Sequence, residues 1–138
     1  MKLSIYVNYP GNCKQALDYY KEHLGARIEM VQTFAQMPGG AGAPAGLSAD
    51  SVLHARYTVG GNTVMCSDGP NVEPVRSAYL TLNVDTTPEA ERIHKALSNG
   101  GQVFMGMEET FFAHRFSMLR DKFGCSWMIL HEKPMPQS

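Results

Sequence analysis

The sequence predicts an α+β fold built from two tandem βαβββ modules. Stretches in which apolar and polar residues alternate, the pattern of half-buried strands, are interrupted twice by a stretch with helical periodicity. The second half of the chain also repeats the order of the first, so that Ile5 corresponds to Leu80 and Gly25 to Gly100. Duplication of one module is the simplest explanation of this repeat.

The first module is predicted to open with a strand over residues 3–8, where apolar and polar residues alternate. A helix follows over residues 12–24, because Asn12 and Gln15 resemble a capping box and Gly25 resembles a C-cap. Three more strands complete the module, the last two joined by a Gly60-Gly61 hairpin turn: 26–33, 52–59 and 62–67.

The second module is predicted to open with a strand over residues 79–84. Its helix begins near Thr86-Thr87-Pro88-Glu89, since proline suits the first helical turn, and it ends at Asn99-Gly100-Gly101. The remaining strands are expected at 102–107, 116–120 and 125–131, with a turn at Asp121-Lys122-Phe123-Gly124. The modules therefore span residues 1–70 and 76–133 of a single domain, 1–138.

Residues 38–50 are too rich in glycine, alanine and proline for regular structure. A loop of this length inside a compact domain is either mobile or functional. A lid over a pocket and a solvated linker within the first module both fit this composition, and the sequence does not separate them.

Charge and terminal composition limit the partners of the chain. Its 138 residues carry 12 basic and 13 acidic side chains, a net charge of -1, without a cluster that could follow a phosphate backbone. Nucleic acid is therefore not expected as a partner. The first residues reach Asn8, Pro10 and Gly11 before an apolar run could act as a signal or membrane segment. We expect a cytoplasmic protein without a membrane partner.

The three cysteines, Cys13, Cys66 and Cys125, are widely separated and form no Cys-x-x-Cys pair. Neither a disulfide framework nor a zinc site is indicated. Cys13 falls near the start of the first predicted helix, where a thiolate can be stabilised, but its apolar helical neighbours favour a buried and inert thiol.

Two modules of this kind resemble the vicinal-oxygen-chelate superfamily, which includes glyoxalase I, extradiol dioxygenases and the fosfomycin and bleomycin resistance proteins. Short sequence motifs along the chain resemble the PhnB-like branch, a group also labelled as a 3-demethylubiquinone-9 3-methyltransferase domain. The similar stretches span nearly the whole chain: Tyr9-Pro-Gly-Asn-Cys-Lys-Gln-Ala-Leu-Asp-Tyr-Tyr20, Thr33-Phe-Ala-Gln-Met-Pro38, Leu53-His-Ala55, Met65-Cys-Ser-Asp68, Glu109-Thr-Phe-Phe-Ala-His114 and Asp121-Lys-Phe-Gly-Cys-Ser-Trp-Met128. The resemblance implies a glyoxalase/dioxygenase-like fold, in which the modules form a curved mixed sheet around a cavity.

The resemblance also implies where a metal is held in metal-binding members of the superfamily. Aligning the motifs places the four ligand positions on Ser4, Met65, Tyr79 and Met128. A hydroxyl, a phenol and two thioethers are poor ligands for zinc, nickel, iron(II) or manganese, which prefer imidazole and carboxylate here. We therefore expect no metal and no cofactor. Without a chelated ion, glyoxalase I activity is not favoured, and methyl transfer is not favoured because the first strand lacks a following glycine-rich loop.

Several polar side chains could contact a ligand. His54 lies on the polar side of a strand and either faces the cavity or is exposed at the sheet edge. The stretch before residue 116 offers Phe112, His114 and Arg115, which either engage a polar ligand or belong to a loop that fills the core with its phenylalanines. Trp127 is predicted to lie in the core beneath a helix. The predicted ligand-binding residues are Tyr6, His54, Met65, Tyr79, Phe112, His114, Arg115 and Met128.

The function these residues favour is metal-free binding of an unidentified small molecule. The alternative is an enzyme of the same superfamily, acting through unaligned metal ligands or through acid-base catalysis by His54 or His114. A scaffold with a vestigial pocket is a third possibility. A homodimer is expected, because open curved sheets leave edges that a second copy can cover, and the resemblance implies the same.

Overall fold

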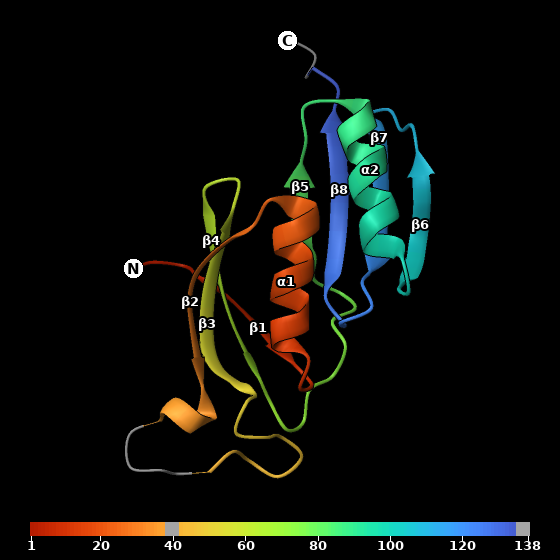
Figure 1. Cartoon of the computed structure of the whole chain (residues 1–138). Coiled ribbons are helices and arrows are strands. Elements are labelled where there is room, and N and C mark those ends of the chain that lie inside the picture. The colour runs from red at the N-terminus through yellow and green to blue at the C-terminus, as the bar shows by residue number, and fades with distance from the viewer. Residues whose placement is uncertain (38–41, 135–138) are drawn as a thin grey trace. The chain divides into compact units, whose positions relative to one another are not determined.

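The computed structural model describes residues 1–37 and 42–134, and the chain divides into two compact units, Met1–Glu73 and Pro74–Ser138. Each unit contains one four-stranded mixed sheet and one α-helix (Figure 1). The predicted α+β class and the two βαβββ modules are confirmed. That the two modules act as one domain stays a prediction.

The first unit follows the predicted order of strand and helix. Its sheet has the strand order β1-β4-β3-β2, in which β1 is parallel to β4 and the other neighbours are antiparallel. The elements are β1 (Ile5–Tyr9), α1 (Cys13–Leu24), β2 (Arg27–Thr33), the 3₁₀ helix η1 (Phe34–Gln36), β3 (Val52–Val59) and β4 (Asn62–Asp68).

The second unit repeats this topology. Its strand order is β5-β8-β7-β6, again with one parallel pair, β5 and β8, at one edge of the sheet. Ile5 pairs with Val64 in the first unit as Leu80 pairs with Trp127 in the second, which agrees with a duplicated module. The elements are β5 (Leu80–Asn83), α2 (Thr87–Ser98), β6 (Gln102–Glu108), β7 (Ala113–Arg120) and β8 (Ser126–Glu132).

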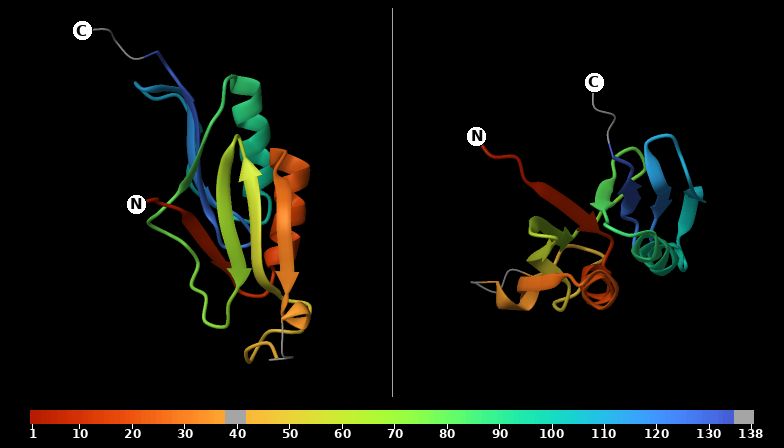
Figure 2. Two further views of the ribbon diagram at one scale, coloured as in Figure 1. Left: turned by 90° about the vertical axis from the view of Figure 1, so that its left-hand side faces the viewer. Right: turned by 90° about the horizontal axis from the view of Figure 1, so that it is seen from above.

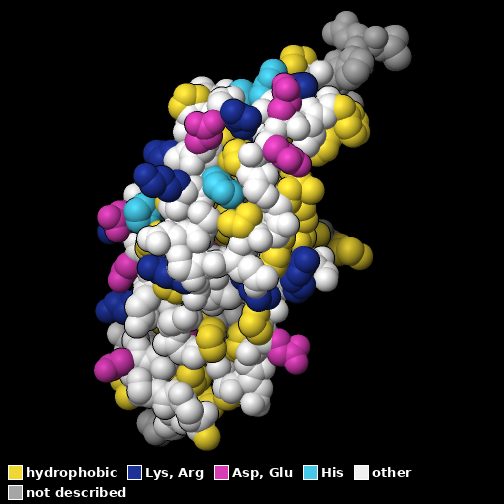
Figure 3. Space-filling view, turned by 90° about the vertical axis from the view of Figure 1, so that its right-hand side faces the viewer, with side chains coloured by type: hydrophobic (Ala, Val, Ile, Leu, Met, Phe, Trp, Pro, Cys, Tyr) yellow, Lys and Arg dark blue, Asp and Glu magenta, His cyan; other side chains and the backbone are white. Residues whose placement is uncertain are grey.

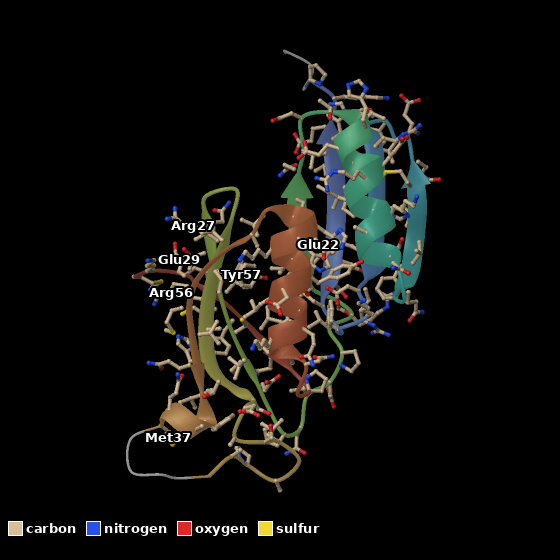
Figure 4. The ribbon with its side chains drawn as sticks, viewed as in Figure 1. Glu22, Arg27, Glu29, Met37, Arg56 and Tyr57 are labelled. Atoms are coloured by element: carbon tan, nitrogen blue, oxygen red, sulfur yellow. The ribbon has the colours of Figure 1, made fainter. Side chains whose placement is uncertain are left out.

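Helix α1 packs on one face of the first sheet (Figure 2). The Tyr20 ring centroid lies 5.8 Å from that of Tyr57 on β3, and the Tyr20 hydroxyl lies 3.1 Å from that of Tyr9 on β1. Figure 4 shows Tyr57 directed toward α1 and Arg56 directed away from it. Successive side chains on a strand point to opposite faces of the sheet. Every second side chain of these strands therefore points away from α1.

The N-terminus of α1 is capped by a carboxylate from another part of the unit. Asp68, at the end of β4, accepts hydrogen bonds from the backbone N–H of Gly11 at 3.0 Å, Cys13 at 2.9 Å and Val52 at 2.8 Å. The predicted capping box at Asn12 is wrong, since the Asn12 side chain makes no cap hydrogen bond. A negative charge is favourable at a helix N-terminus, and this one is supplied by tertiary structure.

A second buried carboxylate organises the turn between β7 and β8. Oδ1 of Asp121 accepts the backbone N–H of Phe123 at 2.9 Å and of Cys125 at 3.0 Å. Its Oδ2 accepts the indole N–H of Trp127 at 2.8 Å. The predicted turn at Asp121–Gly124 and the buried position of Trp127 are confirmed.

Helix α2 begins as predicted but β7 does not. The Thr86 hydroxyl accepts the Glu89 N–H at 3.2 Å and caps the helix. Strand β7 starts at Ala113 and therefore includes His114 and Arg115, which were expected in the preceding loop. The Thr110 hydroxyl accepts the Ala113 N–H at 3.0 Å, which closes the hairpin loop early and lets pairing begin there.

Two predicted turns can be compared with the structure. Gly60 and Gly61 have φ angles of 57° and 83°, so the predicted hairpin turn is confirmed, and both angles favour glycine. Of the loop predicted at 38–50, residues 38–41 lie outside the described residues. Its later part is tied to η1, because Phe34 and Ala35 donate backbone hydrogen bonds to the carbonyls of Ser51 and Ala49.

The cysteines are buried, as predicted for Cys13. The Sγ atoms of Cys13 and Cys66 lie 3.7 Å apart between α1 and β4. The hydrogen bond to Cys66, together with burial, raises the pKa of the Cys13 thiol far above its ordinary value. Cys13 is therefore a poor nucleophile at neutral pH.

No helix in residues 1–37 and 42–134 is long and apolar enough to cross a membrane. On the face shown in Figure 3, Lys and Arg side chains are interspersed with Asp and Glu. The exclusion of nucleic acid stays a prediction.

Asp68→Ala should lower the free energy of unfolding by about 3 kcal/mol or more, because it leaves three backbone donors without their charged acceptor. Urea denaturation followed by circular dichroism measures this loss. Asp50→Ala is the matched control, since Asp50 is exposed in the same unit and should change stability by less than about 0.5 kcal/mol. Equal losses in the two variants would contradict the role given to Asp68.

His94 on α2 should make stability depend on pH. Burial lowers the pKa of His94 below its ordinary value of 6.5, and its Nδ1 lies 2.9 Å from the Ser117 hydroxyl. The unfolded chain then binds the proton more readily than the folded chain. The stabilising contribution is fully present above the unfolded pKa and is lost as pH falls through the lower folded pKa.

His94→Gln removes this titration and retains a side chain able to bond Ser117. Urea unfolding at about pH 7.5 and about pH 5.5 should show a smaller loss of stability on acidification in this variant than in the wild type. The same loss in the wild type and in His94→Gln would show that His94 is not the group responsible.

Candidate functional site

Each sheet has one face covered by its helix and one face that points away from it. We call the face that points away from the helix the distal face. In the first unit Met65 lies on this face, because its neighbour Cys66 contacts Cys13 of α1. Tyr6 of β1 pairs with Met65, and Met65 pairs with Arg56 of β3. Three predicted site residues, Tyr6, His54 and Met65, therefore share the distal face of the first sheet.

Tyr6 and His54 form the main polar contact of this face. The Tyr6 hydroxyl lies 3.1 Å from Nδ1 of His54, and the rings are stacked with centroids 5.7 Å apart. His54 is half-buried, so it faces the sheet surface rather than the core. Within residues 1–37 and 42–134 no carboxylate forms an ion pair with His54. The Tyr6–His54 pair can donate hydrogen bonds to a ligand or accept them from it. The His54 imidazole is not held in one orientation by a carboxylate of the described residues.

The distal face of the second sheet consists of three cross-strand rows. Hydrogen bonds between α2 and the side chains of Arg115 and Ser117 place those residues on the helix side, so Phe116, Met118 and Arg120 lie on the distal face. The strand register then gives one polar row, one row of three methionines and a threonine, and one row with an apolar centre and polar ends. These rows are Gln102, Arg120 and Ser126; then Met105, Met118, Met128 and Thr81; then Glu108, Phe116, Leu130 and Asn83.

The apolar part of this face is continuous. Phe116 and Leu130 are buried together with Ala113, and Met118 and Met128 pack against them half-buried. The Phe112 ring meets the Phe116 ring edge-on with centroids 5.2 Å apart, and Phe112 is 41% exposed. Methionine side chains adapt readily to the shape of an apolar ligand. Two predicted residues, Phe112 and Met128, are thus brought together here.

His114 and Arg115 are not brought together with Met128. Nε of Arg115 lies 3.2 Å from Oε1 of Glu91 on α2, and the ring of His114 lies 4.7 Å from that of His131. A register irregularity between Ala113 and Arg115 turns both side chains toward the helix side. The predicted combination of an aromatic floor with two cations is therefore split between the two sides of the sheet.

Tyr79 precedes β5 and belongs to a cluster that the sequence pattern does not predict. Nη1 of Arg76 donates to the Tyr79 hydroxyl at 2.9 Å, and the Arg76 guanidinium lies over the ring of Phe104. Arg120 approaches the same ring. Strand alternation could have placed Arg120 beside Met118, but Arg76 lies in a connecting segment without periodicity. Phe104 lies where the register shifts between Val103 and Met105, so alternation also fails there.

The chemistry of the donor set tests whether the superfamily's metal would fit. Met65 and Met128 occupy equivalent positions, since one pairs with Tyr6 and the other with Thr81. The aligned positions provide two thioethers, a phenol and the hydroxyl of Ser4, which do not suit a divalent ion that prefers nitrogen and oxygen ligands. In the described part of the chain no three His, Cys, Asp or Glu side chains are grouped as metal ligands.

Comparisons with known proteins agree with this architecture. The family model described as 3-demethylubiquinone-9 3-methyltransferase matches residues 1–130. The chain is 34% identical over 145 residues to Protein YjdN of Escherichia coli (strain K12), covering 99% of this chain and 99% of that protein. Protein PA1353 from Pseudomonas aeruginosa has a crystal structure with a TM-score of 0.85 and 36% identity, covering 97% of this chain and 99% of that chain.

A more distant likeness shows the fold alone. The glyoxylase/bleomycin resistance protein/dioxygenase domain from Frankia sp. EAN1pec has a TM-score of 0.66 at 12% identity, covering 99% of this chain and 95% of that chain. The repeated topology, the aligned motifs and these matches agree. The chain belongs to the 3-demethylubiquinone-9 3-methyltransferase family, and its fold is that of the glyoxylase/bleomycin resistance protein/dioxygenase domain.

Proposed function

We propose that this protein binds a small molecule on the distal face of a sheet, in the cytoplasm and without a metal chelate. The observation that carries the proposal is that Met118 and Met128, on the distal face of the second sheet, stay half-buried and pack against a buried apolar cluster. Apolar surface with a few convergent polar groups is characteristic of small-molecule sites. The distal face of the first unit carries hydrogen-bonding groups of its own, the Tyr6–His54 pair.

Binding is favoured over catalysis by the chemistry of the polar residues. His54 has a tyrosine partner but no paired carboxylate in the described residues, whereas a general base is usually held in one orientation by such a group. The family description names a methyltransferase, yet no glycine-rich loop follows β1 or β5 to hold a nucleotide-like cofactor. We therefore do not extend methyl transfer to this chain.

Purified protein should hold no stoichiometric divalent metal, and its ligands should stabilise it equally with and without such ions. Elemental analysis measures the metal content. A metabolite thermal-shift screen, run with EDTA and with added Zn²⁺, Mn²⁺ or Ni²⁺, identifies ligands, because a molecule that binds only the folded state raises the melting temperature. One tightly held metal per chain whose removal abolishes ligand binding would contradict the proposal.

Two variants test whether the ligands found in the thermal-shift screen bind on the distal face of the second sheet. Met128→Glu places a charge in the centre of the methionine row and should abolish the thermal shift of each hit. Lys95→Glu is the matched control, because it adds the same carboxylate at an exposed position of α2. Circular dichroism checks that both variants fold. Unchanged shifts in a folded Met128→Glu variant would move the binding site elsewhere.

We also propose that the protein is a homodimer. Each sheet ends in edge strands, β1 and β2 in one unit and β5 and β6 in the other, and Ile5, Val103 and Met105 are exposed apolar residues on them. A second copy can cover such edges. Sedimentation velocity should give twice the chain mass of 15.2 kDa, and a monomer at every concentration would overturn this proposal.

A further inference from the structure

Two arginines converge on one aromatic ring at the polar end of the second distal face. The Cζ atom of Arg76 lies 3.9 Å from the ring centroid of Phe104, and the Cζ atom of Arg120 lies 5.5 Å from it. Both distances fall within the range of a cation–π interaction. The ring thus holds two guanidinium groups at one place.

The backbone and neighbouring side chains fix both arginines in position. Val75, the residue before Arg76, donates its N–H to the Gly124 carbonyl at 3.0 Å and accepts a hydrogen bond from the Ser126 hydroxyl. Arg120 donates from Nη2 to Oε1 of Gln102 at 3.0 Å. The guanidinium groups are therefore oriented before any ligand arrives, which lowers the entropic cost of binding one.

The positive charge of this cluster has no acidic partner. Within residues 1–37 and 42–134 neither Arg76 nor Arg120 forms an ion pair. Two like charges held near one ring repel each other, and an anion placed between them would remove that repulsion. Each guanidinium has five N–H donors, and the described contacts of each use one with Tyr79 or Gln102.

Apolar surface begins next to this cluster. On β7, Arg120, Met118 and Phe116 follow one another on the distal face. Strand geometry separates successive residues on one face by about 7 Å. Along β7 this face is therefore cationic at Arg120 and apolar at Met118 and Phe116, and the carboxylate of Glu108 lies beside Phe116 in the last row. This order matches a molecule with an anionic group at one end and a hydrocarbon body.

We infer that the Arg76–Arg120 pair binds the anionic head group, a carboxylate or a phosphonate, of an amphipathic small molecule whose apolar body lies over the half-buried Met118 and Met128. This inference rests on the proposed function and names the ligand class for its second distal face. Tyr79 is a positioning residue in this arrangement, because its hydroxyl accepts a hydrogen bond from Arg76. Phe104 orients both cations.

The test uses four eight-carbon probes with the full-length protein: octanoate, octylphosphonate, octanamide and octylammonium. Isothermal titration calorimetry measures affinity, and ¹³C-methyl NMR of the methionines reports whether Met118 and Met128 are contacted. At least one of the two anions should bind about tenfold or more tightly than neutral octanamide, since each charge-assisted hydrogen bond outweighs a neutral one. The tighter anion identifies the head group. Octylammonium should bind most weakly.

Arginine variants separate the inference from the broader proposal. Arg76→Gln and Arg120→Gln should each weaken the preferred anion by about fivefold or more and leave octanamide unchanged. Arg92→Gln, which removes the same charge from α2, should leave every affinity at the wild-type value. Equal binding of anions and amide, or wild-type anion binding in a variant that carries both arginine substitutions, would refute the inference alone. If no probe binds or shifts the methionine signals, the inference and the proposed binding surface fail together.

Discussion

The first unit depends on one buried carboxylate that accepts three backbone hydrogen bonds. Asp68 lies at the end of β4, its partners Gly11 and Cys13 lie at the entry to α1, and Val52 begins β3. The same interaction therefore fixes where the helix starts and where two strands meet it. With α1 held on one side, the alternation of the strands leaves Tyr6 and its neighbours on the other side, where they are free to contact a ligand.

In the second unit a different buried carboxylate fixes the position of a strand relative to the helix. Asp121 binds two backbone N–H groups of its turn and the indole of Trp127, which fixes the start of β8 below α2. Buried charges are tolerated when hydrogen bonds satisfy their oxygens, and both aspartates meet this condition. Trp127 fills the core on the helix side, so its neighbour Met128 must face away from α2.

Much of the fold could be predicted from the sequence, because its signals are local. Alternation located the strands, and Gly60 and Gly61 marked a hairpin. The cap of α1 could not be predicted, because its acceptor lies 55 residues away from Cys13 along the chain. The distal-face positions of Met65 and Met128 were predictable, because the strands that carry them are regular there. The Arg76 cluster depends on a connecting segment and an irregular β6, where periodicity carries no information about direction.

The repeated module has a consequence for how the protein can change over evolutionary time. Met65 and Met128 occupy equivalent positions, but the residue beside one on the next strand is Arg56 and beside the other is Met118. Each copy satisfies its buried carboxylate within its own unit. Mutations can therefore alter the surface chemistry of one copy without disturbing the folding determinants of the other. A repeated module thus provides this small chain with two sheet surfaces whose side chains can vary independently on one scaffold.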